Sequence, residues 1–406
     1  MAQAPQPDPE LVHKGLALHE AGKSQAALEL YQQFLETMPD HPEVLNFCAL
    51  AYHDLGQQGQ ALDYFTRATA AEPRMLQAWN NKGLLLQSMG RLDEALTAYQ
   101  HITASLDEPS PDAHHNVGNV LYQLGQTEQA LSEFSKTIQL QPGNVAAIGK
   151  LAICHLDLQQ WQPALMAIDT GLVTVPNNTG LLALKSVALK ELGKDNEWRH
   201  LVDFDRLIRH HTFDQVPGFA NLNDLNNAIA EHVLNHPTLV YEPSDNTTTK
   251  GHQSGNLMKT GKGPISALET MIRNSVDDYI KTLTPDAHHP FLSSPPTSWT
   301  INAWATILTT GGHQASHIHR DAWLSGCYYV TLPDLMDQEN KNQQGWIVFG
   351  EPADYPIDKN RQDPKFYKPE ISSLFLFPSY FYHKTVPFVS DQKRISIAFD
   401  IIPTET

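Results

Sequence analysis

The chain has 406 residues, too many for one ordinary hydrophobic core, so we expect two domains. Its formal net charge of −17 argues against nucleic acid as a partner, because binding a phosphate backbone requires a positive surface. The hydrophobic fraction of 41% is that of a globular protein, and no apolar run approaches the length needed to span a bilayer, so no membrane partner is expected.

The N-terminus and the cysteines bear on the compartment of the protein. Residues 1–7 have neither the basic segment nor the apolar segment of a signal peptide. Cys48, Cys154 and Cys327 lie far apart and form neither a disulfide pattern nor a metal-binding pattern. We therefore expect a cytoplasmic protein with reduced thiols.

The first half of the chain repeats itself with a period of about 34 residues. Turn positions recur at intervals of 34, 34, 35, 34 and 34 residues, at Gly22, Gly56, Gly90, Gly125, Gln159 and Gly193. Small residues share this register, at Ala27, Ala61, Ala95, Ala130 and Ala164. Prolines share it too, at Pro39, Pro73, Pro142 and Pro176. These units resemble tetratricopeptide repeats, each of which joins a helix A to a helix B.

Each shared residue type has a physical reason for its place in the repeat. Glycine between the two helices tolerates a positive φ, alanine lets the helices approach closely, and proline ends helix B. About five repeats span residues 8–178, and a less regular unit at 179–211 caps them. Residues 8–211 are therefore predicted to form an all-α helical solenoid.

Stacked repeats form a concave groove, which commonly binds a peptide. Asn80, Asn81, Asn116 and Asn119 fall on A helices, where their amides are candidates to clamp a peptide backbone. Solvated polar helix faces explain the same residues equally well. A peptide or protein bound in the groove is thus a hypothesis for the partner.

The second half, residues 212–406, has the pattern of an α+β domain. Residues 223–235 and 264–283 are predicted helices, and the polar stretch 242–256 is a predicted surface loop. Short segments rich in β-branched and aromatic residues are predicted strands, at 299–308, 324–332, 346–349, 373–377 and 394–401. Two helices followed by many short strands indicate a sheet sandwich or barrel with helices on one side.

A cluster of histidines in this half suggests a metal site. His317, His319 and Asp321 alternate, so that in an extended strand all three side chains face one way, and His383 follows later. Two ligand sets stay open, one with His317 and His319 and the other with His319 and Asp321; His383 belongs to both. Three ligands on one face leave three positions open, as in non-heme Fe(II) oxygenases.

Four segments carry a resemblance to a known family, at residues 311–319, 323–330, 377–383 and 394–400. They look like the 2-oxoglutarate/Fe(II) oxygenases that carry tetratricopeptide repeats. The resemblance covers about residues 200–406. It implies a double-stranded β-helix, the jelly-roll fold of cupins, with Fe(II) and 2-oxoglutarate bound at one mouth.

The resemblance also bears on single residues. It favours His317 as the first ligand, and it places Tyr328 and Thr306 near the tail of the oxoacid. Arg394 and Ser396 alternate on the last predicted strand, where a buried guanidinium can grip the distal carboxylate of 2-oxoglutarate.

The expected function is that of a dioxygenase that uses Fe(II), 2-oxoglutarate and O2. Hydroxylation of a peptide or protein side chain held by the repeats is the first hypothesis, and a free amino acid or other small molecule is a second possible substrate. Two alternatives come from other classes: a catalytically silent interaction scaffold, and a cupin-type metalloenzyme that does not use 2-oxoglutarate. Arg394 disfavours both, because neither needs a buried guanidinium at that position.

Overall fold

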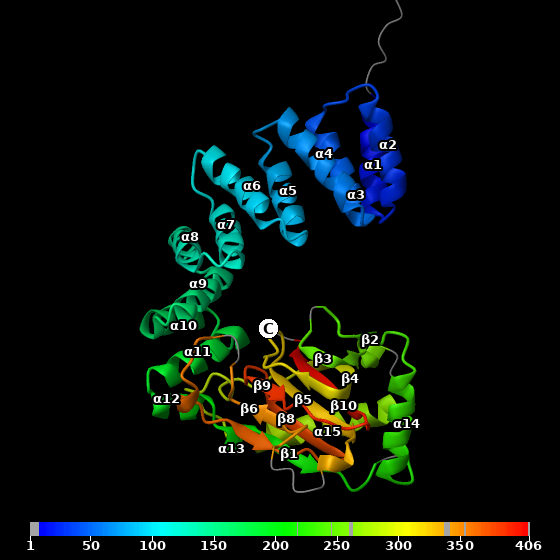
Figure 1. Cartoon of the computed structure of the whole chain (residues 1–406), viewed down its shortest axis with the longest axis vertical. Coiled ribbons are helices and arrows are strands. Elements are labelled where there is room, and N and C mark those ends of the chain that lie inside the picture. Colours follow the sequence, from blue (N-terminus) through cyan, green and yellow to red (C-terminus); the bar gives the residue numbers. More distant parts are fainter. Residues whose placement is uncertain are drawn as a thin grey trace, which may run out of the picture. The chain divides into compact units, whose positions relative to one another are not determined.

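The computed structural model forms two compact units, one up to Cys154 and one from His155 onward (Figure 1). It describes residues 8–216, 218–244, 246–259, 263–336, 342–352 and 355–404. The change from one compact unit to the other falls inside the repeat region, because the last repeat helices pack with the β-rich half. The division of the sequence into domains 8–211 and 212–406 stays a prediction.

The first unit consists of paired helices, as the repeat pattern predicts. They are α1 (Pro9–Glu20), α2 (Ser24–Leu35), α3 (Pro42–Asp54), α4 (Gln58–Ala71), α5 (Leu76–Ser88), α6 (Leu92–Ser105), α7 (Pro111–Gln123), α8 (Thr127–Leu140) and the first part of α9 (Val145–Asp157). Three A helices, α1, α3 and α7, begin with a proline and with a side-chain cap from Asp8, His41 or Ser110. The predicted helical solenoid is confirmed.

The turn between helices A and B requires a left-handed residue in each repeat. The repeat glycines have φ between 68° and 73°, and Gln159, which replaces glycine in the fifth repeat, has φ 57°. Gly118, inside helix α7, is required by packing instead, since a Cβ at this position would lie 2.8 Å from the ring of Phe134. The periodic glycines are thus fixed by backbone geometry and the helical ones by close packing.

The substitution Gln159→Gly is expected to stabilise the second unit by about 0.5–1 kcal/mol. A non-glycine residue in the left-handed region costs about 1–2 kcal/mol, and glycine loses part of this gain through its more flexible unfolded state. Urea unfolding would measure the change. The converse substitution Gly125→Ala, in the equivalent turn, should destabilise the protein, and a Gln159→Gly variant no more stable than the parent would contradict the account.

The second unit contains two antiparallel sheets among its described residues. The larger has seven strands in the order β1-β8-β5-β10-β4-β3-β2, and the smaller has three in the order β7-β6-β9. The strands are β1 (Arg209–Thr212), β2 (Val240–Tyr241), β3 (Thr248–Gln253), β4 (Trp299–Gln314), β5 (Leu324–Thr331), β6 (Ile347–Phe349), β7 (Lys365–Tyr367), β8 (Ser373–Pro378), β9 (His383–Thr385) and β10 (Arg394–Pro403). A single bridge between His317 and His383 links the end of β4 to β9. The expected double-stranded β-helix is confirmed.

Helices support one face of the larger sheet. The helices of this unit are α10 (Trp161–Thr174), α11 (Thr179–Glu191), α12 (Asp195–Leu201), α13 (Phe204–Leu207), α14 (Leu222–Leu234) and α15 (Pro264–Thr282), with short 3-10 turns at Leu257–Lys259, Asp334–Met336 and Lys359–Arg361. Helix α14 packs on β5, where the hydroxyl of Tyr328 donates to Asn226 Oδ1 at 2.8 Å. Residues on the opposite face of the sheet, such as Tyr329 and Ser396, line a pocket together with residues of the smaller sheet.

One predicted loop is wrong in part. Residues 242–256 contain strand β3, which pairs with β4 and continues the larger sheet through β2. The sequence of β3, Thr-Thr-Lys-Gly-His-Gln, is polar, so no apolar alternation marks it as a strand. Its place in the sheet depends on backbone hydrogen bonds to a neighbour that is far away in the sequence.

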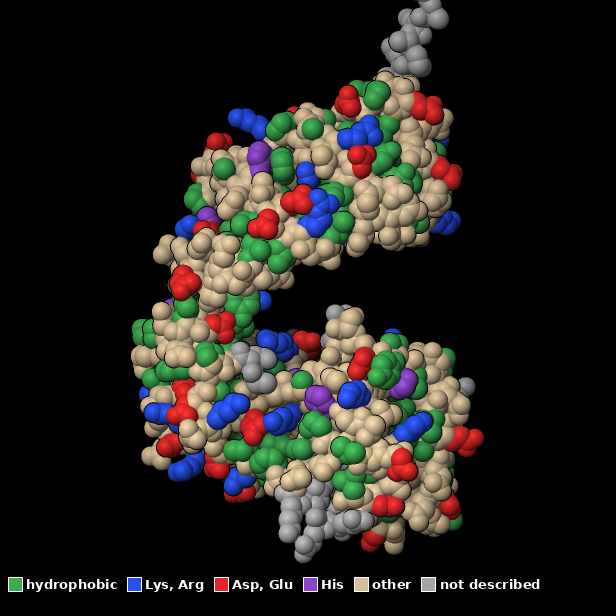
Figure 2. Space-filling model, in the orientation of Figure 1, with side chains coloured by type: hydrophobic (Ala, Val, Ile, Leu, Met, Phe, Trp, Pro, Cys, Tyr) green, Lys and Arg blue, Asp and Glu red, His purple; other side chains and the backbone are tan. Residues whose placement is uncertain are grey.

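The surface shows no broad basic region on the face drawn in Figure 2. Lysine and arginine side chains (blue) are interspersed with aspartate and glutamate side chains (red) there. This agrees with the acidic net charge of −17. No helix within the described parts of the chain is both long and apolar enough to cross a membrane.

Candidate metal centre

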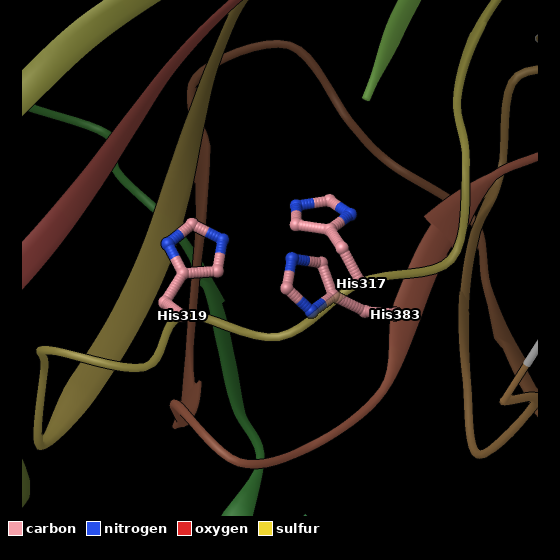
Figure 3. Close-up of side chains that lie close together, drawn as sticks. All are labelled: His317, His319 and His383. Carbon is pink, nitrogen blue, oxygen red and sulfur yellow. The ribbon is translucent and has the colours of Figure 1, made fainter. Parts of the chain in front are cut away.

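Three histidines meet at the joint between the two sheets. His317 and His383 form a two-way backbone bridge, with N–O distances of 3.0 and 3.1 Å, and the backbone N–H of His319 donates to Ser379. One ring nitrogen of each histidine lies within 4.8 Å of the corresponding nitrogens of the other two. Figure 3 shows the three rings gathered around one region, two from the segment after β4 and one from β9.

The other ring nitrogen of each histidine has a hydrogen-bond acceptor. Nδ1 of His317 donates to the carbonyl of Ala315 at 2.7 Å, and Nδ1 of His383 donates to the carbonyl of Phe381 at 3.0 Å. Nδ1 of His319 lies 2.7 Å from a carboxylate oxygen of Asp400. These acceptors hold the proton on Nδ1 and leave the Nε2 lone pair of each ring free, which is how metal-binding histidines are usually oriented.

The environment of two of the rings, those of His317 and His383, favours the neutral form that binds a metal. Burial, aided by the neighbouring His319, lowers the pKa of His317 to about 4. Burial and the two other imidazoles lower the pKa of His383 well below its usual value. Nε2 of His319 is buried and has no hydrogen-bond partner among the described residues. Two imidazoles with lowered pKa values and one orphaned ring nitrogen fit a divalent cation of the Fe(II) type.

Asp321 does not join this group. We expected residues 317–321 to form one extended strand, but β4 ends at Gln314 and the chain turns at Arg320 and Asp321. The Asp321 carboxylate is exposed and lines a different cavity. The geometry therefore favours the ligand set of His317, His319 and His383 over the set that contains Asp321.

A chamber beside the histidines is lined by both sheets. Its walls are Gln314, His317, His319, Gly326, Cys327, Tyr329, Ile347, Phe377, His383, Lys384, Thr385, Arg394, Ser396 and Ala398. Strand β10 supplies Arg394, Ser396 and Ala398 because alternate side chains of a strand share a face. The candidate metal site and the candidate oxoacid site therefore open into the same chamber.

Arg394 is a buried cation that forms no ion pair with any residue the structure describes. Its side chain is 2% exposed, one guanidinium nitrogen donates to Ser396 Oγ at 3.3 Å, and the guanidinium carbon lies 4.9 Å from the ring centroid of Tyr329. Its Nε has no hydrogen-bond partner among the described residues, and neither has Oγ1 of Thr306, which lies opposite Ser396 in the sheet. A buried charge is costly unless it is paired. These unmet groups fit the carboxylate of an oxoacid.

Tyr328 lies on the wrong face for the role expected of it. It pairs with Ile397 and points toward α14, whereas Tyr329 pairs with Ser396 and lines the chamber. Adjacent residues of a strand point to opposite faces, so a shift of one position changes the side. Of the four residues expected at the oxoacid, the structure thus places Arg394, Ser396 and Thr306 on one face and Tyr328 on the other.

Asp400 is a residue of the site that the sequence did not single out. It accepts hydrogen bonds from His319 and from Ser325 Oγ, the latter at 2.6 Å. It follows Arg394, Ser396 and Ala398 on the same face of β10, so alternation along the strand could have marked it. Its contact with His319, which is far away in the sequence, is formed only in the folded protein and could not be predicted from the sequence.

The substitution Asp400→Asn is expected to weaken Fe(II) binding about 10- to 100-fold. The amide keeps the size of the side chain but removes the charge that orients and polarises the His319 ring, and such partners have effects of this order. Anaerobic Fe(II) titration would measure it. Asp391→Asn, on the exposed loop before β10, is the matched control, and equal affinities for the two variants would contradict the role of Asp400.

Comparisons with known proteins agree with both halves of the chain. Residues 302–400 match the family model described as "Putative 2OG-Fe(II) oxygenase". Models of the tetratricopeptide repeat match residues 13–68, 49–114 and 121–187. The first match contains all three histidines of the cluster and the buried arginine.

Two solved structures are similar to part of this chain. PilF of Pseudomonas aeruginosa is 20% identical with a TM-score of 0.40, over 48% of this chain and 90% of that one. MamA of Desulfovibrio magneticus RS-1 is 16% identical with a TM-score of 0.40, over 43% of this chain and 98% of that one. No curated protein gives a significant match. At such low identity and TM-score, neither structure informs the function.

Proposed function

Because the chain joins tetratricopeptide repeats to a domain of the 2OG-Fe(II) oxygenase family, we propose that it is an Fe(II)- and 2-oxoglutarate-dependent dioxygenase that hydroxylates a peptide or protein side chain. The observation that carries the proposal is the convergence of one ring nitrogen from each of three histidines beside a chamber that also contains a buried guanidinium with no ion pair among the described residues. A scaffold needs neither group, and a cupin-type enzyme without 2-oxoglutarate does not need the guanidinium.

In this proposal His317, His319 and His383 hold the metal. Their Nδ1 bonds fix the rings before the metal binds, so that little reorganisation is needed. Arg394 and Ser396 bind the distal carboxylate of 2-oxoglutarate, with Thr306 and Tyr329 beside them. The bound cofactors supply oxidative decarboxylation of 2-oxoglutarate coupled to oxygen insertion into a C–H bond. The buried walls of the chamber keep water away from this chemistry.

The repeats are the proposed site of substrate recruitment. Asn81 donates to Asn46 Oδ1, and Asn116 donates to Asn80 Oδ1, both at 3.1 Å. These bonds connect A helices of neighbouring repeats and hold the amides in fixed orientations, while each amide retains further donors or acceptors. Pre-oriented amides suit a peptide backbone, whose donors and acceptors alternate along an extended chain. Asn119, on α7, completes the set of candidate amides.

A succinate assay tests the proposed reaction. The full chain is incubated with Fe(II), ascorbate and 2-oxoglutarate, with and without a peptide library. We expect iron-dependent succinate that increases with some peptides, together with peptides 16 Da heavier by mass spectrometry. Well-folded protein that forms no iron-dependent succinate would favour the scaffold, and iron-dependent turnover that ignores 2-oxoglutarate would favour the cupin-type enzyme.

A further inference from the structure

A second cavity lies between the start of helix α11 and the turn that follows His319. It has a volume of about 540 Å³, within the range typical of small-molecule sites. Thr179 Oγ1 donates to the carbonyl of Ala322 at 3.1 Å and ties the two walls together. None of the residues that line this cavity lines the histidine chamber, so it is a separate space.

Two opposite charges stand unpaired on the wall of this cavity. Arg320 and Asp321 are adjacent, exposed and turned into the cavity lining. Neither forms an ion pair or a hydrogen bond with any residue that the structure describes, and they are not paired with each other. The side-chain amide of Asn177, on the same cavity, has no hydrogen-bond partner in the described part of the chain either. The cavity thus offers a free cation, a free anion and a free amide.

Arg320 lies against the N-terminal turn of helix α11. A Cβ on Gly180 would be 3.2 Å from a terminal nitrogen of Arg320, so the guanidinium rests on the first turn of α11. The N-terminal end of a 13-residue helix carries a partial positive charge, and a guanidinium placed there is repelled. The Asn178 side chain already caps this turn by accepting from the backbone N–H of Leu181, so the charge of Arg320 is what a ligand carboxylate beside it would neutralise. Asp321 leaves a complementary place for a cation within the same cavity.

Part of the remaining wall is apolar, beside polar residues such as Ser294 and Thr179. The rings of Phe291 and Trp323 stack nearly parallel, with centroids 4.6 Å apart and planes at 7°. Leu182, Pro295 and Pro296 continue this surface. A ligand with a hydrocarbon or aromatic body can therefore cover the apolar wall while its charged groups face Arg320 and Asp321.

We propose that this cavity binds a zwitterionic α-amino acid with an apolar side chain, its carboxylate against Arg320 and its ammonium against Asp321. The site goes beyond the proposed oxygenase reaction and does not depend on it. It uses the two residues that follow His319 and that the metal centre leaves unused.

Calorimetric titration of the full chain with L-leucine and L-phenylalanine tests the proposal. N-acetyl-L-leucine lacks the ammonium, L-leucinamide lacks the carboxylate, and glycine lacks the side chain. We expect both zwitterions to bind and each of the three analogues to bind at least about 10-fold more weakly, since a hydrogen bond to a charged group contributes about 1.5–3 kcal/mol and burial of a leucine side chain about as much. Equal binding of L-leucine and the two single-charge analogues would overturn the proposal, as would the absence of binding by either zwitterion.

Charge variants locate the ligand. Arg320→Gln and Asp321→Asn should each weaken L-leucine binding about 10-fold or more. Lys281→Gln and Asp278→Asn remove an exposed ion pair of 3.2 Å on α15 and serve as matched controls with unchanged affinity. Losses of the same size in the control variants, or unchanged binding in the cavity variants, would place the amino acid elsewhere and refute the site. The assay needs no iron, so its failure would leave the proposed oxygenase function untouched.

Discussion

Replacing His317 by alanine is expected to abolish Fe(II) binding, whereas Asp321→Asn is expected to leave Fe(II) affinity unchanged. The cluster places a nitrogen of His317 within 4.8 Å of nitrogens of the two other histidines, but Asp321 is exposed on a different cavity. Removing a partner that only orients a ligand costs about 10- to 100-fold in affinity, so loss of a ligand should exceed about 100-fold. Anaerobic titration with Fe(II) measures both variants.

The matched control for this experiment is His313→Ala. His313 is close in sequence and lies on β4, and within the described ranges its ring has one hydrogen-bond contact, with the nearby carbonyl of Gly311. Thermal unfolding of each apo variant shows whether the fold is intact, and His317 is only half-buried, so its loss should cost little stability. Retained binding in His317→Ala together with lost binding in Asp321→Asn would establish the other ligand set, His319, Asp321 and His383.

The elements that the sequence predicted well have strong local patterns. Helix α15 has apolar residues at helical spacing, and β10 alternates buried apolar residues with the residues of the chamber. The repeat helices are fixed by glycine and proline in one register. Strand β3 has no such pattern, because its polar side chains do not show which backbone partner the strand will find.

The site shows the same limit at the level of single residues. The histidines could be recognised from their alternation and from the family resemblance, but the turn at Arg320 that removes Asp321 has no glycine or proline to mark it. The phase of the Tyr328-Tyr329 pair depends on the register of β5 against β10, which is shifted by an irregularity between Ile395 and Ser396. Which residues share a face follows from tertiary pairing, and the sequence leaves it open.

Replacing Arg394 by lysine is expected to raise the concentration of 2-oxoglutarate needed for half-maximal turnover about 12- to 160-fold, with Fe(II) affinity unchanged. Lysine keeps the positive charge and most of the side-chain volume, so the substitution should leave the fold intact. It cannot, however, make two parallel hydrogen bonds to a carboxylate. The loss of a charge-assisted hydrogen bond is worth about 1.5–3 kcal/mol, which gives the expected range. Initial rates of succinate formation at varied 2-oxoglutarate measure the effect.

The substitution Ser396→Ala, together with the stability of Arg394→Lys, tests whether Arg394 binds 2-oxoglutarate or only packs in the core. The serine hydroxyl accepts a 3.3 Å hydrogen bond from Arg394, and its removal takes away one neutral group, worth about 0.5–1.5 kcal/mol, or about 2- to 12-fold in 2-oxoglutarate requirement. A packing role for Arg394 would instead lower the melting temperature of Arg394→Lys and change Fe(II) affinity and 2-oxoglutarate requirement together. Unchanged cosubstrate requirement in a folded Arg394→Lys protein would remove the arginine from the cosubstrate site. In that case the buried cation at position 394 would need another anion to explain it.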